Sequence, residues 1–202
     1  MDARIERTTE SLRMAILRLA SEQHVDSLSV SQVAAAANIH RATFYDHAKN
    51  PAQLLARVIR EELAELRATY LTSAYVREHT VQDAIHENTV AVASVVWSHE
   101  AIFRHLIDEP GLTTSQHLLA PHFEETVLGL IADKSWILPD GVCDPRLTRD
   151  DFINGTARFL AAGSAAVVEV WLETAPVTVP RGNDPERYYL LIEPLLPRWL
   201  TA

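Results

Sequence analysis

The chain has 202 residues, of which 48% are hydrophobic, and its formal net charge is −9. This length suffices for one large or two small domains, and the low count of 6 glycines beside abundant alanine and leucine favours an all-α fold. A single cysteine, Cys143, excludes a disulfide within the chain and is interpreted as an incidental thiol rather than a redox sensor. No apolar run is long enough to span a membrane, and the charged opening MDARIERTTE is not expected to be a signal peptide or anchor, so we expect a cytoplasmic protein.

Charge is distributed unevenly along the chain. Residues 1–60 contain 8 Lys and Arg against 6 Asp and Glu, whereas residues 61–202 contain 10 against 21. Only the first segment is therefore suited to approach the phosphates of a nucleic acid. Because it has no steep basic patch, any DNA affinity must come from a few well-placed groups that a dimer presents twice.

Two helices are predicted at the start of the chain. The first runs from about Thr8 to Gln23, where apolar residues recur at helical spacing. The second is short and follows Ser29, which is spaced to form a capping box with Gln32. It is predicted to stop at Asn38, a residue type that tolerates the left-handed conformation of a tight turn.

A third helix is predicted to begin near His40, with Phe44 as its core anchor and polar side chains on its remaining surface. Two short helices joined by about three residues, the second densely polar, form the helix-turn-helix pattern. A fourth helix starts at Asn50 and Pro51, an N-cap followed by a proline at the first helical position, and continues to about Tyr70. Its ~20 residues would span ~30 Å, enough for a stiff strut.

The polar side chains of the second and third helices suit contacts with a DNA duplex. Arg41 has the fork geometry that reads guanine, and Thr43 suits a thymine methyl group or a phosphate. Three residues farther along suit phosphate oxygens, which set the register: Tyr45, His47 and Lys49. At the start of the second helix, the candidates for phosphate binding beside free helix N–H groups are Ser29, Ser31 and Gln32.

As a unit, residues 28–55, LSVSQVAAAANIHRATFYDHAKNPAQLL, resemble the DNA-binding domain of the tetracycline-repressor (TetR) family of bacterial regulators, and the resemblance extends over about residues 8–58. It implies a homodimer that binds a palindromic operator, acts by default as a repressor and is released by an unknown small-molecule effector. The DNA contacts that it implies come from His40, Arg41, Thr43, Tyr45, His47 and Lys49.

Three positions depart from the family pattern. Asn38 stands where the family usually has glycine, and His40 stands where a capping serine is common. Ala48 replaces a usual phenylalanine, so a neighbouring side chain must fill the space behind the third helix. None of the three departures removes a predicted DNA-contacting group.

The expected architecture is all-α, with about nine helices in two domains. A DNA-binding domain of three helices occupies residues 1–50, and a helical regulatory and dimerisation domain occupies residues 51–202, beginning with a linking helix over 51–72. Further helices are predicted over 81–98, 100–108, 115–135, from Thr148 to about Thr174, and from Pro185 onward. Pro194 and Pro197 are expected to kink or fragment the last of these.

The helix that ends near Thr174 is apolar nearly all round, so it must be buried on more than one side. We expect one face to pack on its own domain and the other on a second subunit; the alternative is the central helix of a monomer. The segment FLAAGSAAVVEVWLE also resembles the dimerisation helix of the TetR family. This helix and the last helix are expected to form a four-helix interface with the second subunit. The predicted dimer contacts are Phe159, Gly163, Val167, Val170 and Trp171.

The family resemblance places an effector pocket among the middle helices, where Trp97, Phe103 and His105 are the predicted contacts. Aromatic residues at helical spacing are also typical of plain core, which is the alternative interpretation.

An enzyme is not predicted, because the chain lacks a glycine-rich phosphate loop and the GxSxG and HExxH motifs. No cofactor or metal is predicted either, although His79, Asp83 and His86 can share one helix face that a metal ion would suit. The remaining alternative is a helical ligand-binding or metal-binding protein that does not bind DNA.

Overall fold

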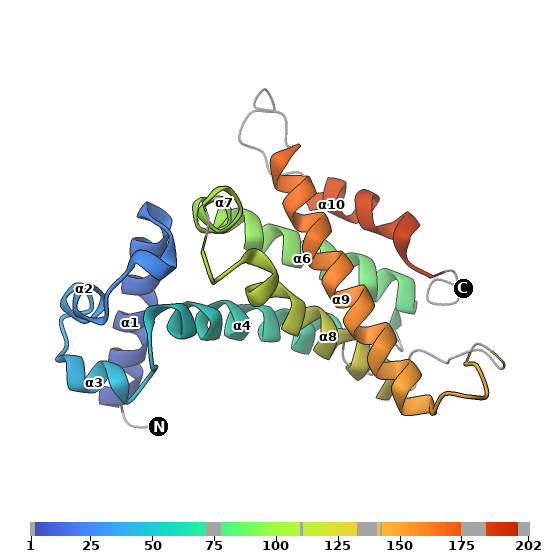
Figure 1. Ribbon diagram of the computed structural model, residues 1–202, viewed down its shortest axis with the longest axis horizontal. Coiled ribbons are helices and arrows are strands. Elements are labelled where there is room, and N and C mark those ends of the chain that lie inside the picture. Colours follow the sequence, from blue (N-terminus) through green and yellow to red (C-terminus); the bar gives the residue numbers. More distant parts are fainter. Residues whose placement is uncertain are drawn as a thin grey trace. The chain divides into compact units, whose positions relative to one another are not determined.

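The computed structural model describes residues 3–71, 78–109, 111–132, 141, 143–174 and 185–197. Throughout this described part, the regular structure is helical, with nine α-helices, two short 3-10 helices and no strand, which confirms the predicted all-α class (Figure 1). None of these helices combines the length and the apolar character needed to cross a bilayer. The predicted loops at 136–148 and 175–184, and the last residues of the helix predicted to Ser135, lie partly or wholly outside the described residues.

The chain divides into two compact units. Residues 1–61 and 98–118 form unit 1, and residues 62–97 and 119–202 form unit 2. Residues 98–118 thus group with the N-terminal helices, which differs from the boundary predicted at residue 50.

Unit 1 is built on α1, whose apolar stripe is its inner face. Leu12, Ala15, Ile16 and Ala20 are at most 4% exposed, and α1 packs against both α2 and α7. The stripe predicted from the sequence consists of Leu12, Ala15, Ile16 and Leu19, and three of these four residues are buried. The helix begins five residues before the predicted start at Thr8. The elements of unit 1 are α1 (Ala3–Glu22), η1 (Val25–Ser27), α2 (Val30–Ala36), α3 (Arg41–Tyr45), the first half of α4 (Pro51–Tyr70), α7 (Glu100–Asp108) and the start of α8 (Ser115–Ala132).

Local signals set the ends of the short helices, as the sequence predicts. Ser29 and Gln32 form the capping box at the start of α2, with hydrogen bonds in both directions. After α2, Asn38 adopts a φ of 54°, in the left-handed region, and this reverses the chain toward α3. Farther on, the Asn50 side chain accepts the N–H of Gln53 at 2.8 Å and caps α4.

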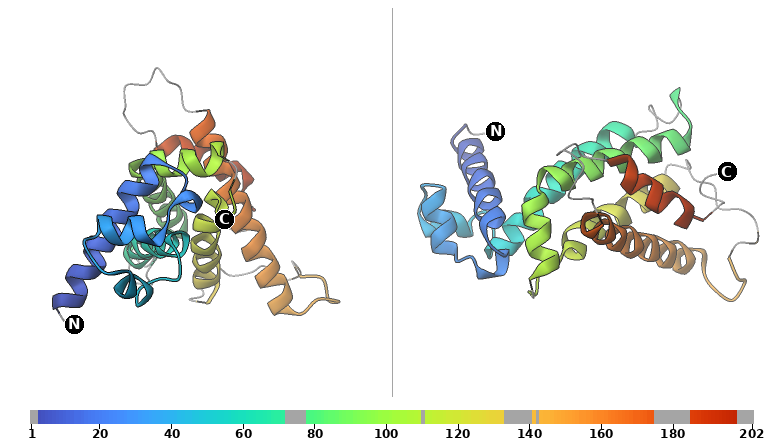
Figure 2. Two further views of the ribbon diagram at one scale, coloured as in Figure 1. Left: turned by 60° about the vertical axis from the view of Figure 1, so that its left-hand side comes forward. Right: turned by 90° about the horizontal axis from the view of Figure 1, so that it is seen from above.

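Unit 2 contains the end of α4 together with α6 (Val81–Ser98), most of α8, α9 (Arg149–Glu173), α10 (Pro185–Ile192) and the 3-10 turn η2 (Glu193–Leu195). Figures 1 and 2 show α9 and α10 side by side, and these two helices are in contact. Pro194 lies in η2, so the predicted fragmentation of the last helix at this proline is confirmed.

The core of unit 2 includes a row of aromatic rings. Trp171 of α9 lies 5.8 Å from the ring of Trp97 and 5.8 Å from that of Tyr188, measured between centroids. Tyr188 is fully buried, and its hydroxyl donates to the carbonyl of Ser164 at 3.0 Å. Ser164 and Trp171 lie on α9 and Tyr188 lies on α10, so this hydrogen bond and the tilted contact between the two rings hold α9 and α10 in one register.

Candidate nucleic-acid interface and ligand cavity

Helix α3 is held by one buried aromatic side chain and presents another to solvent. Phe44 is completely buried, while the neighbouring Tyr45 is 54% exposed. The two rings meet edge to face, with centroids 5.9 Å apart and planes at 89°. Burial of a phenylalanine contributes roughly 1.5–3 kcal/mol, so Phe44 fixes a helix of only five residues while Tyr45 stays on its outer surface.

The predicted contact residues of this segment lie on the outside of unit 1. His40, Arg41 and Lys49 are exposed, and Thr43 and His47 are half-buried. Within the described residues, none of these five side chains forms a hydrogen bond or an ion pair. Donors that are solvated and not engaged by their own chain can be transferred to phosphate or base edges without breaking an internal contact.

Helix α4 supports the end of this segment through the backbone. The Arg57 guanidinium donates to the carbonyl of His47 at 3.0 Å, and the N–H of Lys49 donates to the side chain of Gln53 at 2.7 Å. Ala48, which replaces the larger residue of the family pattern, is only 7% exposed. These contacts fix the positions from which the side chains of His47 and Lys49 extend.

The candidates at the start of α2 differ in how freely they can bind a phosphate. The hydroxyl of Ser29 accepts the N–H of Gln32 at 3.2 Å and donates to its side-chain oxygen at 2.7 Å. Ser29 is thus engaged in the cap, whereas Ser31 is exposed. The cap uses the side-chain oxygen of Gln32, and its side-chain amide nitrogen remains a donor that suits a phosphate.

The three residues predicted to bind an effector lie in different parts of the fold. Trp97 belongs to unit 2 and its ring packs at a tilt against that of Trp171, whereas Phe103 and His105 belong to α7 in unit 1. Phe103 is completely buried, and the ring of His105 pairs with Glu109. None of the three lines the cavity described next, and their role stays a prediction.

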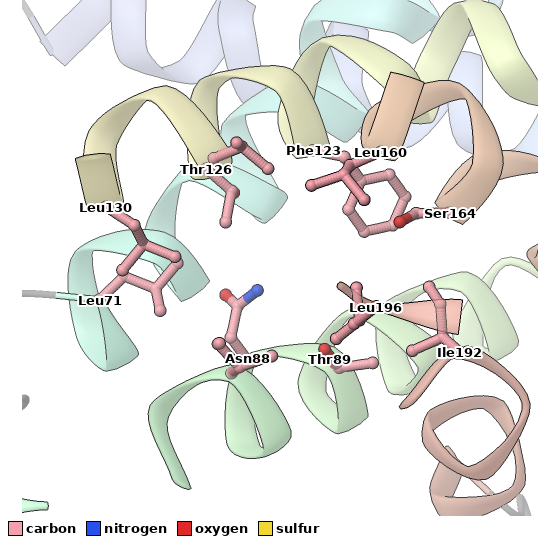
Figure 3. A pocket seen from close by; sticks show the side chains of 12 residues that line it. Leu71, Asn88, Thr89, Phe123, Thr126, Leu130, Leu160, Ser164, Ile192 and Leu196 are labelled. Atoms are coloured by element: carbon pink, nitrogen blue, oxygen red, sulfur yellow. The ribbon is translucent and has the colours of Figure 1, made fainter. Parts of the chain in front are cut away.

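A cavity lies within unit 2, among α6, α8, α9 and α10 (Figure 3). Its volume is about 50 Å³. Eight apolar side chains and four neutral polar ones line it, and the polar residues are Asn88, Thr89, Thr126 and Ser164. Sequence analysis missed these residues, although Asn88 interrupts an apolar row spaced every four residues along α6: Ala84, Val92 and Val96.

The predicted dimer face is largely exposed in the protomer. Phe159 is 76% exposed and Val170 is 46% exposed, and Gly163 between them is also open to solvent. Val167 is half-buried. Trp171, by contrast, is 1% exposed because its indole packs inside unit 2, and we therefore leave it out of the interface.

The three residues considered for a metal ion are engaged in other ways. Asp83 accepts the N–H of Thr80 at 3.0 Å as a helix cap, and the hydrogen bonds from Thr80 lower the pKa of its carboxyl. His86 pairs through Nε2 with Glu186 at 2.9 Å. Across the described residues there is no group of three or more metal-ligating side chains.

Comparison with known proteins relates the N-terminal part of the chain to regulators. Residues 12–58 match the family model described as bacterial regulatory proteins, tetR family. The chain is also 32% identical, over 113 residues, to the uncharacterized HTH-type transcriptional regulator YxbF of Bacillus subtilis (strain 168). This match covers 55% of the chain and 29% of that protein, so the chain spans less than a third of the length of this curated relative.

Solved structures extend the likeness to the whole fold. NalD, the secondary repressor of the MexAB-OprM multidrug efflux pump in Pseudomonas aeruginosa, is 18% identical with a TM-score of 0.55, over 94% of this chain and 96% of that one. The dihydroxyacetone kinase operon activator DhaS is 17% identical with a TM-score of 0.54, over 93% of each chain. AlkX, a TetR family repressor from Dietzia sp. strain DQ12-45-1b, is 19% identical with a TM-score of 0.50, over 92% and 95%. At these identities the likeness shows the fold.

Proposed function

We propose that this chain belongs to the tetR family of bacterial regulatory proteins, binds a palindromic DNA operator as a homodimer and controls transcription from it. A family of regulators also agrees with the sequence prediction that the chain is not an enzyme. The observation that carries the proposal is the outer surface around α3, where the side chains of Arg41 and, after the helix, Lys49 are exposed and form no hydrogen bond or ion pair in the described part of the chain, and where the ring of Tyr45 is exposed beside them.

The roles of the α3 residues follow from their chemistry. Arg41 at the first position of α3 is placed to read guanine with two hydrogen bonds, as the N-terminal residues of a recognition helix do. Tyr45, His47 and Lys49 would bind phosphates and set the register of the helix in the groove. His40 occupies the N-cap position of α3, but its side chain forms no hydrogen bond with the helix, so its ring is available to the DNA.

A homodimer would double this modest set of contacts. The exposed face of α9 around Phe159, Gly163 and Val170, together with the exposed Leu190 of α10, supports an interface with a second copy of the chain. Two-fold symmetric recognition helices about one DNA turn apart, or a multiple of it, would read an inverted repeat.

Release by a small molecule is the third part of the proposal. A mostly apolar cavity with a few polar groups is what small-molecule binding needs, and unit 2 contains one. The effector would prefer a conformation in which α4 swings, so that the two heads no longer fit successive turns of the groove and affinity falls. The sign of regulation is expected to be repression, which is the default of the family.

Selection of bound duplexes from a random library tests the proposal directly. The purified protein is expected to enrich an inverted repeat. Arg41→Ala and Tyr45→Ala should each weaken binding to that repeat by about tenfold or more, since one good base or phosphate contact contributes roughly 1–3 kcal/mol. Arg149→Ala, which removes an exposed arginine of unit 2, is the matched control and should leave the affinity unchanged.

Two results would contradict the proposal. One is the absence of any enriched inverted repeat at low salt, where electrostatic binding is strongest. The other is an equal loss of affinity in Arg149→Ala and Arg41→Ala, which would indicate binding through general charge rather than through α3.

A further inference from the structure

We infer that the effector of this protein is a small, electrically neutral molecule with an apolar body and a hydroxyl or amide head, and that the head binds Asn88. The inference rests on the proposed function, because it assigns a chemical class to the effector in the cavity of unit 2. Three features of the cavity carry it: the absence of charge in its lining, the unpaired polar atoms in its wall, and its small volume.

The lining excludes a charged ligand. All twelve side chains around the cavity are apolar or neutral, and no Asp, Glu, Lys, Arg or His is among them. A carboxylate or ammonium group inside would lose its hydration without gaining a counter-charge, which costs several kcal/mol in a protein interior. The part of the effector that lies in the cavity must therefore carry no charge.

Asn88 identifies where the polar head of the ligand belongs. This residue is 4% exposed, yet its side-chain oxygen has no hydrogen-bond partner. Figure 3 shows the amide extending from α6 into the cavity, toward the wall that carries Thr126. A buried amide oxygen without a donor is costly in a protein that must fold without its ligand, so its retention points to a donor that arrives with the ligand.

Thr126 of α8 supplies a second polar group on the opposite wall. Its hydroxyl oxygen is also buried without a partner, and it lines the same cavity. A ligand hydroxyl can donate to Asn88 and accept from Thr126, whereas an ether oxygen can only accept. The pair thus selects a head group that both donates and accepts.

The volume of the cavity limits the size of the body. It is about 50 Å³, which favours a small aliphatic body over a broad ring system. The apolar side chains around it include Leu71, Ile85 and Leu130, so an aliphatic body would lie against hydrocarbon.

Calorimetry on the whole purified chain, without DNA, tests the inference with a series of isomers. The probes are the linear primary alcohols from butanol to decanol, each paired with its isomeric methyl ether, and the carboxylates and ammonium compounds of the same lengths. At the chain length that fits, the alcohol is expected to bind roughly tenfold or more tightly than its ether, because the ether leaves Asn88 unpaired. The charged compounds are expected not to bind.

Substitutions then assign the selectivity to Asn88. Asn88→Leu should abolish the preference for the alcohol and raise the melting temperature, because it removes an unpaired buried polar group at similar volume. Thr126→Val should reduce the preference and provides a second, milder variant. Thr69→Val removes an exposed hydroxyl that bonds to the carbonyl of Glu65 and should change neither measurement.

The inference is overturned if ethers bind as well as alcohols at every length, if a charged series binds more tightly, or if no alcohol binds. It is also overturned if Asn88→Leu lowers the melting temperature, since Asn88 would then be satisfied within the fold. Operator binding is measured separately on the same preparation. A protein that selects its operator but ignores the alcohols keeps the proposed function and loses only the class of effector.

Discussion

His122 of α8 shows how strongly a single buried side chain can depend on its surroundings. The residue is 1% exposed, and neither ring nitrogen has a hydrogen-bond partner. Burial, with a smaller contribution from the positive charge of Arg67, lowers the pKa of His122 from 6.5 to about 3. Arg67 itself pairs with Glu125 at 2.7 Å, so its charge is fixed close by. The folded protein therefore holds His122 neutral over the whole physiological range.

This buried histidine makes the stability of the fold sensitive to acid. Above pH 6.5 the side chain is neutral in both states, and its contribution to stability is fully present. Below pH 6.5 only the unfolded chain takes up the proton, so stability is lost until the pH reaches about 3. The free energy of unfolding should fall by about 2 kcal/mol between pH 7 and pH 5 from this group.

Denaturant titrations at fixed protein concentration between pH 5 and pH 7 measure this slope. His122→Leu should flatten the dependence, because the group that titrates is gone. His40→Gln replaces an exposed histidine and should leave the slope unchanged. A wild-type slope that persists in His122→Leu would show that another group is responsible.

Residues whose partners lie within one helical turn were predictable from the sequence, and residues whose partners lie elsewhere were not. The capping pair of Thr148 and Asp151 needs only three residues of spacing, and the structure has it. The role of Asn88 depends on which side chains of α8 and α9 face it, which no local pattern contains. Likewise, the sequence of α9, which has apolar residues on nearly every face, does not reveal that Trp171 turns inward, because contacts with Trp97 and Tyr188 determine this.

At the scale of elements, hydrogen bonds to Asp26 connect the turn η1 with the segment between α7 and α8 inside unit 1. The carboxylate of Asp26 accepts the N–H groups of Leu112 at 2.6 Å and Thr113 at 2.8 Å, and the Thr113 hydroxyl at 2.6 Å. Burial alone would raise the pKa of Asp26, but the hydrogen bonds from Thr113 and Leu112 outweigh it and lower the pKa. Beside this carboxylate, Gly111 leaves room for the buried ring of His24: a Cβ there would lie 2.9 Å from Asp26 and still closer to the ring.

Asp26→Asn should therefore destabilise unit 1. The variant loses the negative charge and replaces one of the two oxygens that accept the three hydrogen bonds with an NH2 group. Because the side chain is partly exposed, the expected loss in the free energy of unfolding is about 1 kcal/mol. The deficit should be present at neutral pH and disappear as the pH falls through the lowered pKa of Asp26, because the wild-type carboxylate is then protonated too. Chemical denaturation at pH 7 and at a series of pH values descending from 3.8 measures how the difference declines.

Two glycine substitutions test the contact between η1 and the segment that follows α7, one within that segment and the other elsewhere as its matched control. Gly111→Ala should destabilise the chain, because the new methyl group would clash with His24 and Asp26. Gly129→Ala, at a helical position with nothing within 4 Å of the new Cβ, should be neutral or stabilise by about 0.5–1 kcal/mol. Equal effects of the two substitutions would mean that the segment beside η1 adapts freely and that Asp26 does not hold it.

At the scale of the whole molecule, the uneven charge of the chain would make the proposed DNA binding dependent on self-association. The first 60 residues carry a balance of +2, whereas the remainder carries an excess of 11 acidic residues, so a single head has little general attraction to phosphate. A dimer presents two sets of specific contacts at once, and the second set binds at a high effective concentration. Loss of the proposed interface should therefore weaken operator binding even though it leaves α3 untouched.

Phe159→Glu tests this dependence, because the residue is 76% exposed in the protomer and its replacement should not disturb the core. A glutamate on each copy would place like charges and unpaired carboxylates in the apolar face around Gly163, so sedimentation should show a monomer for the variant and the proposed dimer for the wild type. Operator affinity should fall by at least about tenfold, and binding to an isolated half-site should stay unchanged. Met14→Glu adds the same charge at another exposed apolar side chain, on α1, and should leave the protein dimeric. A Phe159→Glu variant that remains dimeric would place the interface on a different face, and the exposed surface of α9 would then need another partner.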